Sequence, residues 1–208
     1  RGRPPGACRY RHLGRLAKGT GRFELLGFVV SREGAINGQA YAAWVRAATR
    51  GRRLTEFPIP VGVAVTDIEA GIPLLIVDGD PGEAVQASAT VPGTVIPVSS
   101  NGRTLVDGGV LSIVPVRFAR ALGADVVVAV DIFCGQIPPL KQNALDTVLN
   151  TLRLQSCLLG KDEIASADIL IRPGFEPDDP ASFSQRERAV EAGYAAAKAA
   201  LPAIRERL

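Results

Sequence analysis

The stretch Ala124-Asp125-Val126-Val127-Val128-Ala129-Val130-Asp131 decides the fold class of this chain. Its apolar run from Val126 to Val130 has the length of a strand. A strand that is apolar on both faces is typical of a parallel strand inside a sheet covered by helices. The stretch therefore predicts an α/β fold, a three-layer sandwich with a mainly parallel central sheet flanked by helices.

On either side of this stretch, expected strands alternate with expected helices. Asn37 is a suitable N-cap for the first helix, and Pro81 suits the first position of the second. Ser182 or Ser184 is expected to cap the last helix. We expect helices over about 37–49, 81–90, 116–122, 143–159 and 182–200. We expect one hairpin from strands 61–66 and 73–77, and a second from strands 95–98 and 104–106 with its tip at 99–103. A late strand is expected over 168–171.

The charge of the chain is unevenly distributed. The 208 residues carry a net charge of +3, but residues 1–53 hold 12 Lys and Arg against two acids. A basic arm can bind nucleic acid or an anionic surface. Because this arm lacks interleaved aromatic residues and is rich in Pro and Gly, we expect disorder and no nucleic-acid partner. We therefore divide the chain into a basic, disordered or unreliable segment, 1–22, and an α/β domain, 23–208.

The start of the sequence is unusual. The chain begins with Arg1 and contains no Met, so we expect it not to be a complete reading frame. Residues 1–22 have no apolar core of a signal peptide, and no stretch approaches the roughly 18 apolar residues of a membrane span.

Several classes of site are poorly supported by residue content. His12 is the only histidine, which argues against Ser-His-Asp, Cys-His and His-containing metal sites. The odd set of Cys8, Cys134 and Cys157 matches no zinc or disulfide pattern, so we expect buried or incidental thiols. No nucleotide-binding loop is present, and we expect no cofactor.

A carboxylate magnesium site is the remaining metal alternative. Its ligands would come from strand ends and turns. Aspartate in such places is more often a turn residue, so we do not expect this site. The carboxylates concerned are Asp67, Asp78, Asp80 and Asp131.

The run Leu105-Val106-Asp107-Gly108-Gly109-Val110 carries the main candidate for catalysis. An aspartate at a strand end, beside glycines that leave the approach open, is well placed to act as a base. A carboxylate can activate a serine directly, without histidine, when its surroundings raise its basicity. The alternative is an ordinary turn, with Asp107, Gly108 and Gly109 as turn residues.

Five pieces of the sequence, in order, resemble the bacterial branch of the patatin-like phospholipase family. Each piece alone is weak, but five in order over about two thirds of the chain are specific. They are Arg32-Glu33-Gly34-Ala35-Ile36-Asn37-Gly38; Ala64-Val65-Thr66-Asp67-Ile68-Glu69-Ala70-Gly71; Gly79-Asp80 with Ala84-Val85-Gln86-Ala87-Ser88-Ala89-Thr90-Val91-Pro92-Gly93; Val106-Asp107-Gly108-Gly109-Val110 with Pro115-Val116; and Gly123 to Asp131.

The resemblance implies a Ser-Asp dyad, with Asp107 as the base and Gly108 and Gly109 completing its motif. The family's nucleophile lies in Gly-x-Ser-x-Gly, upstream of all the matched pieces, and this sequence contains no such motif. Ser31 lacks the first glycine, Ser88 falls in an expected helix, and Ser112 follows Asp107 too closely.

We therefore expect the C-terminal two thirds of a lipid acyl hydrolase, a phospholipase or esterase that is inactive as given. The substrate would be a phospholipid or other acyl-lipid ester, with peripheral contact to a membrane surface. The alternatives are a non-catalytic relative that binds lipid or a partner, and an α/β domain whose basic arm binds an anionic surface. A homo-oligomer stays open, as does a cytoplasmic, periplasmic or membrane-associated location in a bacterium.

Overall fold

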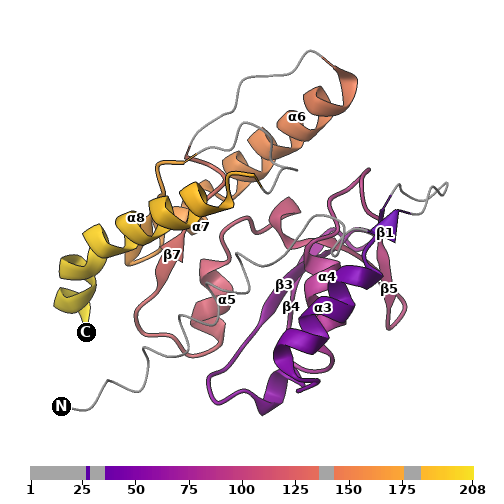
Figure 1. Ribbon diagram of the computed structural model, residues 1–208, viewed down its shortest axis with the longest axis horizontal. Coiled ribbons are helices and arrows are strands. Elements are labelled where there is room, and N and C mark those ends of the chain that lie inside the picture. The colour runs from indigo at the N-terminus through magenta and orange to yellow at the C-terminus, as the bar shows by residue number, and fades with distance from the viewer. Residues whose placement is uncertain (1–26, 29–35, 136–142, 176–183) are drawn as a thin grey trace.

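The computed structural model describes residues 27–28, 36–135, 143–175 and 184–208. The described N-terminal half, drawn in indigo to magenta, lies on one side of the molecule, and the orange and yellow C-terminal elements lie on the other (Figure 1). Residues 1–22, Ser31 and Ser182 lie outside the described part. Two short strands, β1 (Gly27–Phe28) and β2 (Ile36–Asn37), pair antiparallel at the start of the described chain.

The largest sheet of the described residues has four strands in the order β4-β3-β6-β5. They are β3 (Val63–Asp67), β4 (Ile72–Ile76), β5 (Val98–Ser100) and β6 (Arg103–Asp107). Both expected hairpins are present, β3–β4 and β5–β6, but the second differs in its bounds: β5 begins at Val98, and residues 99, 100 and 103 of the expected tip lie in paired strands. The second closes through Asn101 and Gly102, whose φ angles of 51° and 72° suit a two-residue turn between twisted strands.

Two helices support this sheet. Helix α3 (Gln39–Thr49) packs on α4 (Pro81–Ser88), and α4 packs on β3 and β6. The buried cluster between α4 and the sheet contains Val65, Ala87 and Leu105. The Asp80 side chain caps α4 by accepting a hydrogen bond from the Gly82 N–H at 2.8 Å. A short 3-10 helix, η1 (Leu54–Glu56), lies between α3 and β3.

The second group of elements surrounds a parallel pair of strands. Strand β7 (Val128–Val130) pairs in parallel with β8 (Ile169–Ile171). Helices α5 (Val116–Ala121) and α7 (Lys161–Ala165) contribute Val116 and Ile164 to a core that includes Val127 and Ala129. The other face of β7 is open, since Val128 and Val130 are 39% and 53% exposed.

Two longer helices complete the described chain, α6 (Ala144–Leu159) and α8 (Arg186–Arg207). In Figure 1, α6 rises above the antiparallel sheet, and α8 runs along the C-terminal side of the molecule to the chain end. Among the described residues, no helix combines the length and the apolar character that crossing a membrane requires.

The structure corrects the prediction of a mainly parallel sheet. The largest described sheet is antiparallel throughout. Two of its pairings are hairpins closed by short turns, which can join only antiparallel neighbours, and the third pairs β3 with β6 across a long connection. The parallel character inferred from residues 124–131 holds for β7 and β8 alone, whose connection is long and contains helices. The α/β class is confirmed; the extension of one parallel signal to the whole sheet was wrong.

Two predicted helix starts also differ. Gly38, not Asn37, is the N-cap of α3, and α8 begins after Gln185 without a side-chain cap, so Ser184 is not its cap.

Candidate active site

Asp107 ends β6 at the point where the chain turns sharply into the 3-10 helix η2 (Gly108–Val110). Its backbone N–H donates to the Thr90 carbonyl at 2.9 Å, which fixes the strand end against the segment after α4. Its Oδ1 accepts a hydrogen bond from the Gly109 N–H at 2.7 Å. The carboxylate is therefore the N-cap of η2, so the turn interpretation of these residues also holds.

Glycine is required at positions 108 and 109 because neighbouring atoms lie too close for a side chain. A Cβ on Gly108 would lie 2.3 Å from the Ala64 carbonyl oxygen, inside the backbone of β3. A Cβ on Gly109 would lie 3.0 Å from Asp107 Oδ1 and 2.7 Å from the end of the Ile113 side chain. The two glycines thus let the loop fold onto β3 and leave the space beside the carboxylate clear.

Burial raises the pKa of Asp107 above its usual value, and the hydrogen bond from Gly109 opposes this only in part. Within the described residues, no cation lies at ion-pair distance from it, and the Gly109 N–H is the single donor to its carboxylate. None of these residues donates a hydrogen bond to its Oδ2. A carboxylate of raised basicity with one oxygen available has the properties of a general base.

A groove of about 480 Å³ opens beside Asp107. Most of its lining is apolar. One wall is formed by η2, another by α6, and a third by the segment that follows β7. The lining residues are Val91, Pro92, Asp107, Gly109, Val110, Ile113, Ile132, Phe133, Asp146, Leu149, Asn150, Leu152, Arg153 and Ser156. A groove of this size and lining suits an apolar chain whose reactive end lies at Asp107.

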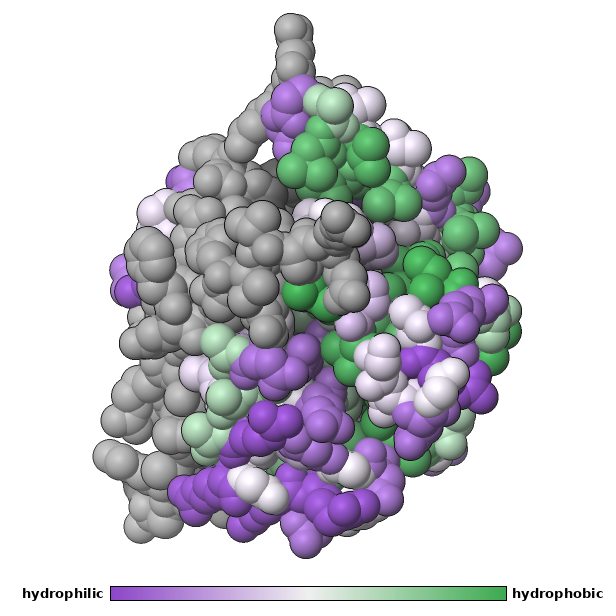
Figure 2. Space-filling view, turned by 90° about the vertical axis from the view of Figure 1, so that its right-hand side faces the viewer, coloured by the Kyte–Doolittle hydropathy of each residue, from purple (hydrophilic) through white to green (hydrophobic). Residues whose placement is uncertain are grey.

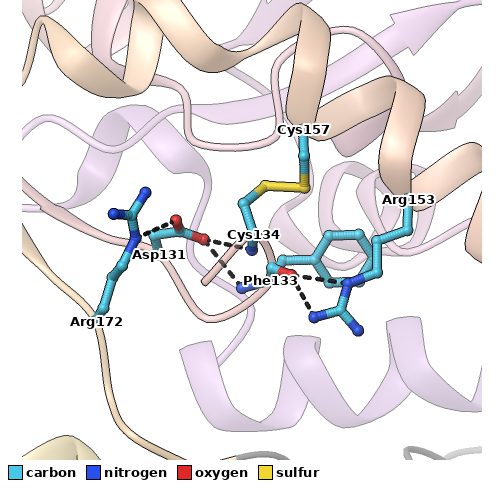
Figure 3. Close-up of a disulfide and its surroundings, with 6 residues drawn as sticks. All are labelled: Asp131, Phe133, Cys134, Arg153, Cys157 and Arg172. Carbon is cyan, nitrogen blue, oxygen red and sulfur yellow. Dashed lines mark hydrogen bonds and ion pairs between the residues drawn. A yellow bond between two sulfur atoms is a disulfide. The ribbon is translucent and has the colours of Figure 1, made fainter. Parts of the chain in front are cut away.

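A disulfide joins two of these walls. Cys134, just after β7, is bonded to Cys157 on α6, with their Cα atoms 5.5 Å apart (Figure 3). The expectation that both cysteines are incidental thiols was wrong. Arg153 strengthens the same junction by donating from Nε to the Phe133 carbonyl at 2.8 Å and by lying over the Phe133 ring.

The four carboxylates of the magnesium alternative are each paired with an arginine. The nearest nitrogen to oxygen distances range from 2.5 to 3.0 Å. A guanidinium at that distance occupies the position a cation would take, so these carboxylates have structural partners. The pairs are Arg103–Asp67, Arg53–Asp78, Arg46–Asp80 and Arg172–Asp131.

The two candidate serines that the structure describes, Ser88 and Ser112, do not form a dyad with Asp107. Ser88 is the last residue of α4, as expected. Ser112 is buried, and its hydroxyl donates to the Glu163 carboxylate at 3.0 Å, which ties η2 to α7. Neither lines the groove. Ser31 and His12 lie outside the described residues.

A family model for patatin-like phospholipases matches residues 10–120 of this chain. The chain belongs to the patatin-like phospholipase family. The match contains Asp107, Gly108 and Gly109, and it begins inside the segment 1–22 that the sequence analysis separated from the domain.

The curated relatives extend the comparison. An uncharacterized NTE family protein of Mycobacterium tuberculosis is 29% identical over 112 residues, covering 54% of this chain and 31% of the relative. A second, from Mycobacterium bovis, is 30% identical over 145 residues, covering 58% and 25%. Patatin-like phospholipase domain-containing protein 7 of Mus musculus is 29% identical over 98 residues, covering 46% and 7%. The chain thus spans less than a third of the length of these relatives.

The groove contains residues that the sequence analysis did not single out. Phe133 comes from the segment after β7 and Arg153 from α6, and the two meet because α6 lies against that segment, where the Cys134–Cys157 disulfide joins them. One signal was present: Cys134 follows the predicted strand, and Cys157 lies near the end of the predicted helix. Nothing in that pattern fixed the orientation of the helix.

Proposed function

We propose that this chain is the Asp-bearing part of a lipid acyl hydrolase and that Asp107 is the base of a Ser-Asp dyad. The observation that carries the proposal is the position of Asp107. Its carboxylate has a raised pKa and an available oxygen, and it lines a largely apolar groove. Membership of the patatin-like phospholipase family supports lipid esters as the substrate class.

The chemistry follows from this position. Asp107 Oδ2 takes the proton of a serine hydroxyl as the serine oxygen attacks the ester carbonyl, and Asp107 then gives this proton to the alcohol oxygen as the ester C–O bond breaks. Water then attacks the acyl-enzyme, Asp107 accepts a proton from the water, and it returns that proton to the serine oxygen as the fatty acid is released. The groove between η2 and α6 holds the acyl chain, so the carbonyl carbon lies at the Asp107 end.

The nucleophile of this reaction lies, on this proposal, in residues that the 208-residue sequence does not contain, because no Gly-x-Ser-x-Gly is present. The chain as given is then inactive in ester hydrolysis, and its own measurable property is acyl-chain binding.

Hydrolysis of a p-nitrophenyl acyl ester tests the dyad. We expect no turnover by the 208-residue chain and turnover once an upstream Gly-x-Ser-x-Gly segment is restored. Asp107→Asn in the restored protein should lower kcat by several orders of magnitude. The matched control is Asp125→Asn, an exposed aspartate outside the groove, which should leave kcat unchanged. Restored activity that survives Asp107→Asn would exclude Asp107 as the base.

Binding of a fluorescent fatty acid, cis-parinaric acid, tests the groove in the chain itself. Leu149→Arg places a charge on the α6 wall of the groove and should weaken binding by about tenfold or more. Leu145→Arg makes the same change on the same helix at a side chain that is 55% exposed and outside the groove lining, and it should have little effect. Equal affinity in both variants would place the acyl chain elsewhere.

A second candidate function is lipid or partner binding without catalysis. The absence of a Gly-x-Ser-x-Gly motif favours it. Acyl binding sensitive to Leu149→Arg, together with no hydrolysis after the upstream segment is restored, would support this candidate over the enzyme.

A further inference from the structure

Helix α6 forms one wall of the groove, and its surface is largely exposed. None of its residues is buried. Figure 2 shows apolar side chains gathered at the upper end of the molecule, the end at which α6 lies in Figure 1. Five of its apolar side chains are at least half exposed: Leu145, Val148, Leu154, Leu158 and Leu159. Because apolar burial normally holds an amphipathic helix in place, α6 needs other attachments to keep its position.

The strongest of these attachments is covalent. The Cys134–Cys157 disulfide joins α6 to the segment after β7, and Figure 3 shows it between the two backbones. Beside it, the Arg153 side chain reaches from α6 to the Phe133 carbonyl and ring. Both cysteines are partly exposed, so a reductant in solution can reach the bond.

The segment after β7, which carries Cys134, is itself held in place by hydrogen bonds. Asp131 follows β7, and its side chain is fully buried. Its carboxylate accepts hydrogen bonds from the N–H groups of Phe133 at 3.0 Å and Cys134 at 2.8 Å, and from Arg172 Nε at 2.9 Å. Cys134 is therefore held in place independently of α6. Breaking the disulfide would leave this anchor intact and remove the covalent link that holds the helix to it.

We propose that the Cys134–Cys157 disulfide is a redox-controlled tie that fixes α6 as a wall of the groove. The reductant is a dithiol. Its two thiols transfer two electrons and two protons to the protein disulfide, which gives the Cys134 and Cys157 thiols and a disulfide in the reductant. Oxidation by a disulfide of that class reverses the exchange. Acyl binding follows the redox state because α6 supplies Leu149, Leu152 and Ser156 to the groove, a consequence that rests on the proposed function.

Hydrogen exchange tests the tie without any lipid. The full chain is compared before and after treatment with dithiothreitol, in a Cys8→Ser background that prevents disulfide exchange with the third cysteine. On reduction, we expect the exchange of α6 amides to accelerate at least about tenfold more than that of β3 amides, because β3 amides respond only to the loss of global stability. Unchanged exchange in α6 would overturn the proposal, and so would equal acceleration in α6 and β3, since that would mark a general loss of stability.

A variant removes the dependence on the reductant. Cys134→Ser with Cys157→Ser should show fast α6 exchange under both conditions, whereas Cys8→Ser alone should respond to dithiothreitol as the parent does. A double variant that still responds to dithiothreitol would overturn the proposal, because the response would then have another origin.

Binding of cis-parinaric acid tests the link to the groove. We expect about tenfold weaker binding after reduction. Equal affinity in both states, with faster α6 exchange on reduction, would overturn control of the groove while supporting the tie. Absence of binding in both states would refute the acyl site of the proposed function, and the exchange measurement would still decide the tie.

Discussion

Replacing Gly108 with alanine tests whether the Asp107 loop is packed as tightly as the structure shows. The new Cβ would lie 2.3 Å from the Ala64 oxygen and 2.7 Å from its carbonyl carbon, where ordinary contact begins at 3.4 Å. The loop and β3 must therefore separate by about 1 Å, and both contacted atoms belong to the backbone of an inner strand. Overpacking costs about 1–3 kcal/mol, and we expect about 3 kcal/mol because a backbone atom cannot rotate away.

Thermal unfolding measures this cost. For a chain of this size, about 3 kcal/mol corresponds to a Tm lower by about 6–12 °C. The matched control is Gly193→Ala in α8, where nothing lies within 4 Å and alanine should stabilise the helix by about 1 kcal/mol. A Tm for Gly108→Ala within about 1 °C of the parent would refute the close packing of η2 on β3, and with it the fixed position of Asp107.

Three further changes probe the carboxylates and the disulfide. Burial raises the pKa of Asp107 in the folded state, so folding becomes less favourable as pH rises from about 4 through the raised pKa. Asp107→Asn removes this cost and should therefore raise Tm at pH 7. The gain should shrink below about pH 4. Burial alone would raise the pKa of Asp131, but hydrogen bonds from Cys134 and Arg172 outweigh burial and hold that pKa below its usual value. The ionised Asp131 therefore stabilises the fold above about pH 4, and this stabilisation is lost as pH falls through the lowered pKa. Asp131→Asn should lower the free energy of unfolding, measured in urea at pH 7, by about 3 kcal/mol. The variant should also lose less stability than the parent as pH falls, and an unchanged dependence of stability on pH would contradict this. Cys134→Ser with Cys157→Ser opens a loop of 23 residues and should lower the free energy of unfolding by about 3 kcal/mol, whereas a loss below about 1 kcal/mol would mean that the bond contributes little.

Local signals in the sequence were sufficient for the elements that carry Asp107. Asn101 and Gly102 can take positive φ, so a hairpin there followed from turn chemistry alone. The apolar run ending at Val130 gave a strand, and its partner is indeed parallel. The prediction that the whole sheet is mainly parallel was wrong, because the order of strands in a sheet depends on which hairpins pair with each other. The antiparallel pairing of β3 with β6 joins segments far apart in the sequence.

The site was predictable only where one short segment builds it. Asp107, Gly108 and Gly109 act through contacts within their own turn and with β3, so their pattern was legible in the sequence. The groove needs α6 to lie against the segment after β7, and the sequence gives the length of that helix but not its direction. For the same reason, three cysteines in an odd set could not reveal that Cys134 and Cys157 meet.

The division of the site between elements has a consequence for function. Asp107, the apolar lining and the disulfide all come from residues 91–157, so the groove is assembled within this chain. The serine that the proposed reaction requires has no counterpart in the sequence. Acyl-chain binding and ester cleavage are then separable properties. The first depends on how α6 is held against η2, and the second on a hydroxyl brought to Oδ2 of Asp107. On the proposed function, a chain with this groove would bind a lipid tail whether or not it cleaves the ester.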